Sequence, residues 1–394
     1  MILPLYGTAS YCSGFDRDRV RSSIRLRAVE STAERHSSDF ALTKTPDQFE
    51  RAAQNNWQSI FFVTGDSIDL PHLDYPERRL VIVPSRYSYL DDGDVLGIDH
   101  SSGKFRTLFR RSSAHNSFLV TERCNNYCLM CSQPPKDIDD RWILNEIKES
   151  LPLVDSTTRA LTFTGGEPLS DWPDFIRVLK QCRDQLPATS VQVLTNGRGF
   201  AFSEIVDAWK EVKHPNLMAA IPVYASVDYV HDHVVQAKGA FDETVLGILK
   251  LKDRGQRVEI RVVLHALTAP IISETCRWIA RNLPFVDHVA LMGLENTGFA
   301  IANEALLWID PIDYRDALAE GVGLLNSAGV NVSVYNLPRC VLDRSIWPYA
   351  VQSISDWKNG FVAECEFCVE KLRCSGLFTS GRPRLSRGIR AIAA

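Results

Sequence analysis

Hydrophobic residues between positions 116 and 292 form short runs that alternate with stretches of helical spacing. The runs are expected to be strands, at 117–121, 159–164, 190–195, 219–226, 257–264 and 286–292. The intervening stretches are expected to be helices, near 141–151, 172–186, 202–213, 241–254 and 270–283. Repeated strand-then-helix units predict an α/β fold, a parallel sheet with helices outside it. The sheet would be a partial barrel or an open doubly wound sheet, with chemistry at the carboxyl ends of its strands.

The first 115 residues have a different, β-rich pattern. Strand-like runs are found at 60–64, 79–84, 94–98 and 105–109. One helix is predicted after Thr45, which serves as N-cap, with Pro46 in the first helical position and Gln48 completing a capping box. Nothing in this region suggests chemistry. We therefore expect residues 1–115 to be a structural or substrate-presenting domain.

Composition restricts the class of protein. A chain of 394 residues predicts two or three domains, and 45% hydrophobic with 23% charged residues is typical of a soluble globular protein. The N-terminus lacks the pattern of a secretory signal, and no run of apolar residues is long enough to span a membrane. We therefore expect a cytoplasmic protein without a membrane partner.

The charge distribution argues against a general nucleic-acid partner, because the net charge is −4. Three basic stretches nevertheless occur, at 17–27, 105–111 and 381–390. They are predicted to be solvated surface or flexible tail, with a docking surface for an acidic partner as the alternative.

Three cysteines, Cys124, Cys128 and Cys131, follow the first predicted strand of the α/β region. In a cytoplasmic protein, clustered cysteines bind metal or act in catalysis more often than they form disulfides. A Cys-x3-Cys-x2-Cys loop can hold three corners of a 4Fe–4S cluster and leave one iron open to a substrate. The alternative is a zinc ion held by these three residues and a distant fourth ligand.

Other unusual residues also fall at predicted strand ends. Gly165–Pro168 follows the second strand, Thr195–Gly197 the third, Ser226–Asp228 the fourth, and His265 the fifth. Since the carboxyl ends of parallel strands meet at one edge, these motifs should converge on one rim. We expect His265 to be a polar residue of that rim, with a catalytic role as the less favoured alternative.

Two kinds of residue are expected to be structural. Alternation along 257–264 places Glu259 and Arg261 on the inner face of the sheet, as an ion pair or in contact with a cofactor or substrate. Cys182 and Cys276 lie on apolar helical stripes and should be buried core thiols. Cys12 has no assigned role.

Four further cysteines lie near the C-terminus, namely Cys340, Cys365, Cys368 and Cys374. Four thiolates form a closed site, which suits a second iron–sulfur cluster or a structural zinc. We therefore expect residues 311–394 to be a separate cysteine-rich domain after the α/β region at 116–310.

The cysteine trio, followed about 35 residues later by "TGGEP", resembles the radical S-adenosylmethionine (SAM) superfamily. The resemblance covers about 116–310 and implies a partial (β/α)6 barrel. It implies that Cys124, Cys128 and Cys131 hold a 4Fe–4S cluster whose open iron is chelated by SAM. The cluster, reduced by an external one-electron donor such as flavodoxin or ferredoxin, would cleave SAM to a 5′-deoxyadenosyl radical that abstracts a substrate hydrogen.

The same resemblance assigns residues to SAM. The GGE turn would contact the methionine amino group, Ser226 and Asp228 the ribose, and Met130 the adenine, where the family often has an aromatic residue. The complete set of expected SAM contacts is Met130, Gly165, Gly166, Glu167, Pro168, Thr195, Asn196, Ser226, Asp228 and Arg261.

The C-terminal spacing Cys-x2-Cys-x5-Cys resembles the middle of the SPASM extension, but Phe378 stands where that extension has another cysteine. This favours the shorter, single-cluster version called twitch. Taken as a whole, the chain resembles HxsC, the radical SAM maturase family of the His-Xaa-Ser repeat system, at 105–137, 258–268 and 353–368. The resemblance implies a ribosomally made peptide substrate and a second radical SAM maturase as partner.

The leading hypothesis is therefore a radical SAM peptide maturase with two 4Fe–4S clusters. One alternative is a radical SAM enzyme that acts on a small metabolite. The other is a non-catalytic interaction protein that binds zinc at both groups of cysteines.

Overall fold

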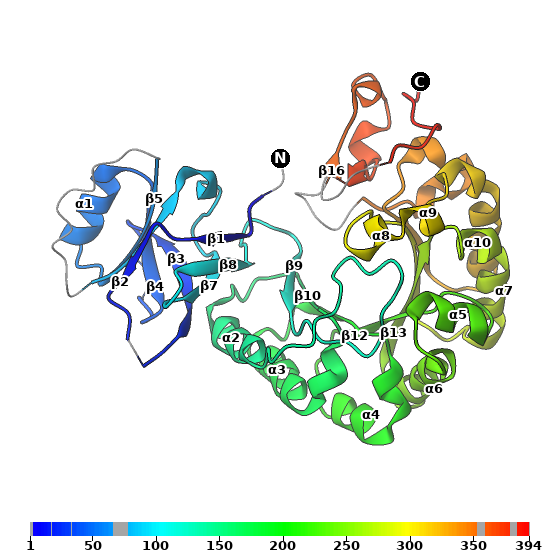
Figure 1. Cartoon of the computed structure of the whole chain (residues 1–394), viewed down its shortest axis with the longest axis horizontal. Coiled ribbons are helices and arrows are strands. Elements are labelled where there is room, and N and C mark those ends of the chain that lie inside the picture. Colours follow the sequence, from blue (N-terminus) through cyan, green and yellow to red (C-terminus); the bar gives the residue numbers. More distant parts are fainter. Residues whose placement is uncertain are drawn as a thin grey trace.

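The computed structural model describes residues 3–16, 18–32, 34–65, 78–352, 359–378 and 384–393. Strands in these segments form sheets of eight, seven and two strands. Figure 1 shows the eight-stranded sheet on one side of the molecule and the seven-stranded sheet on the other. No helix in the described segments is both long and apolar enough to cross a membrane.

The eight-stranded sheet has the order β1-β8-β7-β3-β4-β5-β6-β2, in which β3 to β6 run parallel. Its strands are β1 (Tyr6–Thr8), β2 (Tyr11–Ser13), β3 (Arg21–Ala28), β4 (Asp39–Thr43), β5 (Ser59–Thr64), β6 (Arg79–Pro84), β7 (Val95–Asp99) and β8 (Lys104–Phe109). The last four were predicted and the first four were not. Helix α1 (Pro46–Gln54) begins as predicted, because the Thr45 side chain accepts a hydrogen bond from the Gln48 N–H at 3.3 Å.

The basic stretch 17–27 is largely strand β3, so its interpretation as solvated surface or flexible tail was wrong. Arg25 forms two hydrogen bonds to the Asp39 carboxylate, of 2.7 and 3.0 Å, and Arg21 pairs with Asp99 at 3.0 Å. Arg17 lies outside the described residues. Near the C-terminus Arg384 and Arg387 also pair with acidic residues, while 381–383 are not described.

Helix α2 (Trp142–Ser150) joins the two large sheets. The buried Glu146 carboxylate on this helix accepts a 2.6 Å hydrogen bond from Arg106 Nε on β8. The guanidinium groups of Arg21 and Arg106 lie 3.7 and 4.8 Å from the ring centroid of Trp142. These cation–π contacts and the ion pair fix the first sheet against the helix.

The seven-stranded sheet runs in the order β15-β14-β13-β12-β11-β10-β9, and all its neighbours are parallel. Its strands are β9 (Asn116–Leu119), β10 (Ala160–Thr164), β11 (Ser190–Leu194), β12 (Leu217–Pro222), β13 (Arg257–Leu264), β14 (His288–Gly293) and β15 (Val332–Tyr335). The predicted α/β fold with a parallel sheet is confirmed. The seventh strand, β15, was not predicted and lies beyond residue 310.

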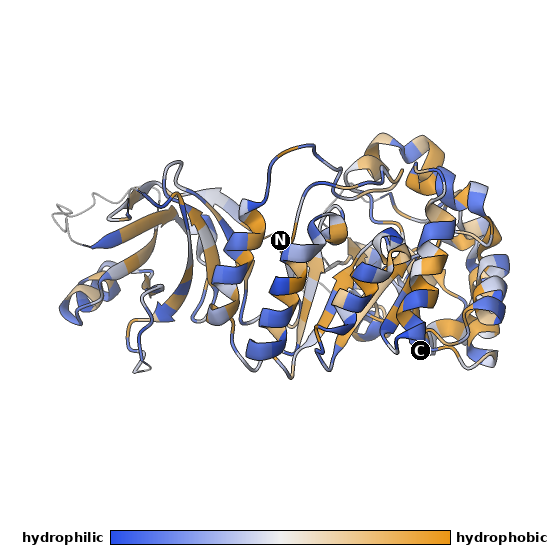
Figure 2. Ribbon diagram, turned by 90° about the horizontal axis from the view of Figure 1, so that it is seen from below, coloured by the Kyte–Doolittle hydropathy of each residue, from blue (hydrophilic) through white to orange (hydrophobic). Residues whose placement is uncertain are grey.

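Helices follow the outer side of this curved sheet (Figure 1). After α2 they are α3 (Trp172–Gln185), α4 (Ser203–Lys210), α5 (Asp228–Val235), α6 (Ala240–Asp253), α7 (Ile272–Asn282), α8 (Phe299–Ala302), α9 (Glu304–Leu307) and α10 (Arg315–Ser327). Figure 2 shows their apolar faces directed inward and their polar faces outward. Cys182 on α3 and Cys276 on α7 are fully buried, as predicted.

The last sheet pairs β16 (Asn359–Gly360) with β17 (Leu377–Phe378) in antiparallel fashion. The cysteines at 365, 368 and 374 lie between these two strands.

Candidate functional site

The segment that contains Cys124, Cys128 and Cys131, which we call the cysteine loop (residues 124–131), follows β9 at the carboxyl edge of the parallel sheet. The turn after β10 hydrogen-bonds to the chain leading into it. Gly166 N–H donates to the Thr121 carbonyl at 2.7 Å, and Glu167 N–H donates to the Arg123 carbonyl at 2.8 Å. The "TGGEP" motif and the cysteine trio therefore meet in space, as the convergence of strand ends predicted.

Glycine is required at this junction because the two backbones approach so closely. A Cβ on Gly166 would lie 2.0 Å from the Arg123 carbonyl oxygen, and one on Gly165 would lie 2.4 Å from the Thr121 oxygen. Both distances are far below van der Waals contact, so a side chain would push the turn away from the loop.

The Glu167 carboxylate joins the second and third strand ends. It is 3% exposed, and Oε1 accepts hydrogen bonds from Thr195 Oγ1 at 2.6 Å and from Leu169 N–H at 2.9 Å. Oε2 accepts one from Asn196 N–H at 2.7 Å. Burial raises the pKa of Glu167, while these hydrogen bonds oppose that rise. Thus three of the predicted SAM-binding residues, Glu167, Thr195 and Asn196, lie together beside the loop.

Arg198, which follows β11, is hydrogen-bonded to the cysteine loop. The sequence did not single out this residue as part of the site. Its Nη1 donates to the Asn125 carbonyl at 2.9 Å and to Asn126 Oδ1 at 2.7 Å, and its Nε pairs with Glu243 at 2.5 Å. Asn196 Nδ2 adds a 2.6 Å hydrogen bond to Asn125 Oδ1. A basic residue directly after "TNG" was the signal available in the sequence.

The far side of the loop rests on α5 and α8. Leu129 N–H donates at 2.9 Å to the carbonyl of Val234, near the C-terminal end of α5. Phe299 N–H, at the start of α8, donates to the Cys131 carbonyl at 2.8 Å, and Asn303 Nδ2 donates to the Leu129 carbonyl at 2.8 Å. Hydrogen bonds from several separate elements therefore define the path of the loop.

The three thiols of the loop are close enough to influence one another. Burial, together with a smaller contribution from the negative charges of neighbouring groups, raises the pKa of Cys124 to about 11 and of Cys128 to about 12. Cys124 Sγ accepts a 3.4 Å hydrogen bond from Asn126 N–H. Grouped, partly buried thiols of this kind become good ligands when a bound cation replaces their protons, so the donor set fits an iron–sulfur cluster.

The other residues predicted to contact SAM differ in their burial and in their hydrogen bonds. Ser226 Oγ donates to Glu274 at 3.3 Å, and Asp228 is an exposed residue at the start of α5. Pro168 is buried directly after Glu167. Met130 is 7% exposed and packs in an apolar cluster with Tyr224, Val234 and Leu307. The burial and hydrogen bonds of these residues do not test SAM binding, so their assignment to SAM stays a prediction.

The inner face of the sheet carries a polar network. The Glu259 carboxylate accepts a 3.0 Å hydrogen bond from Gln192 Nε2 and lies 2.9 Å from His288 Nδ1. Arg261 Nε lies 3.6 Å from Glu259, and Arg261 Nη2 donates to Met292 Sδ at 3.0 Å. The expected structural ion pair is thus present on the inner face.

His265 directly follows β13 at the carboxyl edge of the sheet, where a polar rim residue was predicted, and its side chain is fully buried. Its Nδ1 accepts a 3.3 Å hydrogen bond from Leu267 N–H, and its Nε2 has no hydrogen-bond partner among the described residues. Burial lowers the pKa of His265 to about 4. Tyr224, which the sequence analysis missed, lies between His265 and His231, with ring centroids 6.5 and 5.6 Å away.

The four C-terminal cysteines, which we call the tail cysteines (Cys340, Cys365, Cys368 and Cys374), line the walls of one cavity. Backbone N–H groups donate to two of their sulfurs, Arg339 to Cys374 and Ile392 to Cys368, both at 3.4 Å. A buried ion pair of 2.5 Å between Arg339 and Glu370 lies in the same wall. Across the segments described, no three His, Cys, Asp or Glu side chains are arranged to hold a single metal ion.

Comparison with known families identifies a class for the α/β region. Residues 118–279 match the family described as the Radical SAM superfamily. This match supports the radical SAM superfamily and a radical SAM enzyme, and the superfamily implies SAM and a 4Fe–4S cluster as cofactors.

Several solved structures are similar in part. SuiB of Streptococcus suis bound to S-adenosylmethionine is 14% identical, with a TM-score of 0.44, over 56% of this chain and 50% of that one. SuiB bound to its precursor peptide SuiA is 13% identical, with a TM-score of 0.44, over 58% of this chain and 49% of that one. A radical SAM methyltransferase from Sphaerobacter thermophilus is 14% identical, with a TM-score of 0.44, over 61% of this chain and 72% of that one. The chain thus spans about half the length of SuiB. No curated protein matches it.

Proposed function

We propose that the protein is a radical SAM enzyme that modifies a ribosomally made peptide of the His-Xaa-Ser repeat type, as the resemblance to HxsC implies. The observation that carries the radical SAM part is the hydrogen-bonded junction between the cysteine loop and the "TGGEP" turn, where a Cβ on Gly166 would lie 3.1 Å from the Cβ of Cys124. The peptide part is supported by the resemblance at 105–137, 258–268 and 353–368, of which 353–358 lie outside the described residues.

In this proposal Cys124, Cys128 and Cys131 would hold the 4Fe–4S cluster. When bound and reduced by a donor such as ferredoxin or flavodoxin, the cluster and SAM supply a 5′-deoxyadenosyl radical for hydrogen abstraction. Glu167 and Arg198 fix the loop against the second and third strand ends. The apolar cluster around Met130 and Tyr224 packs against Cys128 and keeps water from that side of the loop.

The residues proposed to bind SAM surround the same loop. Gly165, Gly166 and Glu167 would meet its methionine part, with Pro168, Thr195 and Asn196 in the same cleft. Ser226 and Asp228 would bind the ribose, Met130 the adenine, and Arg261 would face SAM or substrate from the inner face of the sheet.

The tail cysteines are proposed to hold a second 4Fe–4S cluster, with zinc as the alternative. Four thiols around one cavity, two of them with N–H donors, are consistent with the closed ligand set of such a cluster. With this assignment the chain would comprise a β-rich domain at 1–115, a partial (β/α)6 barrel at 116–310 and a twitch-like domain at 311–394. A second radical SAM maturase would be its partner.

Anaerobic purification followed by iron, sulfide and zinc analysis tests the metal assignments. Two clusters predict about eight iron atoms per chain and absorbance near 400 nm, whereas a zinc-binding interaction protein would be colourless. Incubation with dithionite and SAM should then release 5′-deoxyadenosine. Mass spectrometry of a co-expressed His-Xaa-Ser peptide should reveal a mass change that depends on this enzyme. Release of 5′-deoxyadenosine that only a small metabolite stimulates would contradict the peptide proposal.

A further inference from the structure

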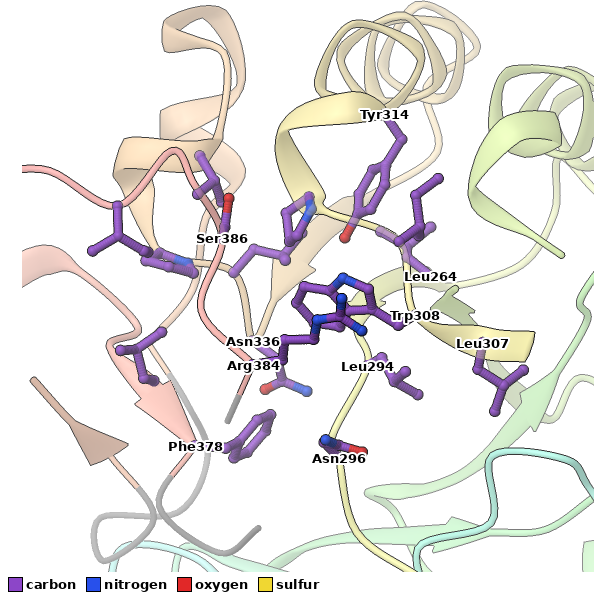
Figure 3. A pocket seen from close by; sticks show the side chains of 17 residues that line it. Leu264, Leu294, Asn296, Leu307, Trp308, Tyr314, Asn336, Phe378, Arg384 and Ser386 are labelled. Atoms are coloured by element: carbon purple, nitrogen blue, oxygen red, sulfur yellow. The ribbon is translucent and has the colours of Figure 1, made fainter. Parts of the chain in front are cut away.

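Residues 384–393, which we call the C-terminal segment, run from the α/β region to the tail cysteines. Near its start the Arg384 guanidinium lies 3.5 Å from Glu304 and 5.2 Å from the ring centroid of Trp308, which Figure 3 shows beside it. Near its end the segment passes the sulfur of Cys368. One short stretch of chain therefore contacts both regions.

The first half of the segment is held by the turn between α9 and α10. The Asp310 carboxylate, which is only 12% exposed, accepts hydrogen bonds from the Ser386 hydroxyl and, at 3.0 Å, from the Arg387 N–H. Arg387 Nη1 donates to the Asp313 carboxylate at 3.0 Å. Because Asp310 is largely buried, water and salt screen its hydrogen bonds little, so it fixes the position of the segment.

The second half of the segment presents backbone N–H groups to the tail cysteines. Ile392 N–H donates to Cys368 Sγ at 3.4 Å, and the Ile392 carbonyl accepts a 3.1 Å hydrogen bond from Val369 N–H. Burial raises the pKa of the Cys340 thiol, and the Arg390 N–H beside it opposes that rise by stabilising the thiolate. Two of the four sulfurs therefore face N–H groups of the same segment.

The segment also closes the cavity of the tail cysteines on one side. Ile389, Arg390 and Ile392 line this cavity together with the four cysteines. The apolar side chains of Ile389 and Ile392 keep water from that wall, and exclusion of water strengthens hydrogen bonds to the sulfurs. The contacts of the segment thus bear on the ligands themselves.

We infer that the C-terminal segment is a clamp for a metal centre on the tail cysteines, with Asp310 as a positioning residue that holds the Arg390 and Ile392 N–H groups against Cys340 and Cys368. The inference rests on the proposed function, because it requires a metal bound by these cysteines. Thiolate ligands bring several negative charges to one cavity, and N–H groups that face them offset part of that charge. The clamp should therefore slow loss of the metal and, for a 4Fe–4S cluster, favour its reduced state.

The test uses the full chain with Cys128→Ala, in which the tail cysteines alone should retain metal. Ile392→Pro removes the N–H donor to the sulfur, and Asp310→Ala removes the acceptor of Ser386 and Arg387. Each variant should release tail metal to a chelator about fivefold faster, as expected for the loss of one hydrogen bond at the ligands.

Two matched variants control for side effects of these substitutions. Ala393→Pro places the same ring next to Ile392, at an exposed residue whose N–H donates no hydrogen bond to the described part of the chain. Asp316→Ala removes an 86% exposed carboxylate that pairs with Arg315 rather than with the segment. Both should release the metal within about twofold of the Cys128→Ala rate.

Reduction of the tail cluster separates a clamp on the ligands from general support of the fold. At a fixed applied potential, followed by EPR, Ile392→Pro and Asp310→Ala should each lower the ratio of reduced to oxidised cluster about threefold, while both controls leave it unchanged. A variant that only loosens the fold would release metal faster at the same ratio. Faster release at an unchanged ratio, or unchanged release and ratio in both variants, overturns the inference.

Metal analysis and release of 5′-deoxyadenosine separate this inference from the proposed function. If the tail holds zinc, the second cluster is wrong, and zinc release from the same four variants tests the clamp. If the tail holds no metal in Cys128→Ala, the clamp is overturned, while release of 5′-deoxyadenosine by the wild type still supports the radical SAM proposal. If the variants behave as expected but the wild type releases no 5′-deoxyadenosine, the clamp stands and the radical SAM proposal fails.

Discussion

The cysteine loop and the tail cysteines contain similar ligands in different surroundings. Three thiols of the loop fall within eight residues, and hydrogen bonds from the second and third strand ends, α5 and α8 hold the intervening backbone. The tail cysteines span 340 to 374, and short 3₁₀ turns such as Ala363–Cys365 and Lys371–Arg373 carry or flank them. The loop is therefore built on the rigid edge of the sheet, and the tail on turns that are joined by the Arg339–Glu370 ion pair.

The two sites also differ in the hydrogen bonds that their backbone and sulfur atoms make. At the loop, most of the hydrogen bonds position backbone; of its sulfurs, Cys124 accepts a backbone N–H, from Asn126, and Cys131 donates to the Gln133 carbonyl. At the tail, Cys368 and Cys374 themselves accept backbone N–H groups. Donors to sulfur raise the reduction potential of a cluster by stabilising added negative charge. Two tail sulfurs accept N–H groups from Arg339, Gly376 and Ile392, whereas Cys124 accepts one at the loop, so the tail should hold the more easily reduced centre.

The largest effect should come from removing one thiol from each site. Cys128→Ala should lower 5′-deoxyadenosine release to the reagent background, because two thiols are too few to hold the loop cluster. Cys368→Ala should keep that release. Each variant should retain about half of the iron, measured by chelation assay. Release of 5′-deoxyadenosine by Cys128→Ala would contradict the assignment of the active site.

The next largest effect should come from removing a buried carboxylate, either Glu167 beside the cysteine loop or Glu370 beside the tail cysteines. Glu167→Ala should lower the free energy of unfolding by about 3 kcal/mol, because Leu169 N–H, Asn196 N–H and the Thr195 hydroxyl lose their acceptor. Urea unfolding measures this change. Glu370→Ala is the matched control at the tail, and only Glu167→Ala should lower iron bound by the loop. Equal iron loss in both variants would show that the sites are coupled.

The sequence predicted the parts of the fold whose signals are local. Six strands of the parallel sheet are short runs rich in apolar residues, and the Cys-x3-Cys-x2-Cys spacing is visible within eight residues. Strand β15 has only four residues, and Gly321 and Gly323 weaken the helical pattern of α10, so neither element was predicted.

The missed parts of the site depend on contacts between distant positions. Arg198 and Asn126 are 72 residues apart, and no local pattern identifies such a pair. Likewise, the burial of His265 depends on distant positions: its ring lies 6.5 Å from that of Tyr224, and the next residue, Ala266, donates its N–H to the Leu307 carbonyl at 2.9 Å. The basic stretch of β3 was misinterpreted because its partners Asp39 and Asp99 lie on other strands.

A smaller effect should come from the titration of His265, which should make the stability of the α/β region depend on pH. Burial lowers the pKa of His265 to about 4, below its unfolded value of about 6.5. The unfolded chain therefore binds more protons between pH 4 and 6.5, and stability present above pH 6.5 is lost as the pH falls toward 4. His265 should contribute about 2 kcal/mol to the loss between pH 7.5 and pH 5.

Urea unfolding of the wild type and of His265→Gln at both pH values checks this prediction. Glutamine can still accept the Leu267 N–H but does not titrate, so the variant should lose less stability on acidification. The chain has no histidine after position 288, so histidine titration should not act directly on the tail cysteines. An identical pH dependence in wild type and variant would contradict the role of His265.

The smallest effect should come from Arg198→Lys. Lysine keeps the charge opposite Glu243 but loses the paired hydrogen bonds of the guanidinium to Asn125 and Asn126, worth about 1 kcal/mol. The loop should then release its iron to a chelator about fivefold faster, by the conversion of about 1.4 kcal/mol per tenfold. The measurement is made in the Cys368→Ala background, where only the loop retains iron.

Arg339→Lys is the matched control, because Arg339 pairs with Glu370 beside the tail cysteines. In the Cys128→Ala background this variant should release tail iron faster, and in the Cys368→Ala background it should leave loop iron unchanged. Faster loss of loop iron in Arg339→Lys would mean that the tail supports the cysteine loop. The two sites would then form one unit, and the hydrogen bonds at the strand ends would not be sufficient to hold the loop.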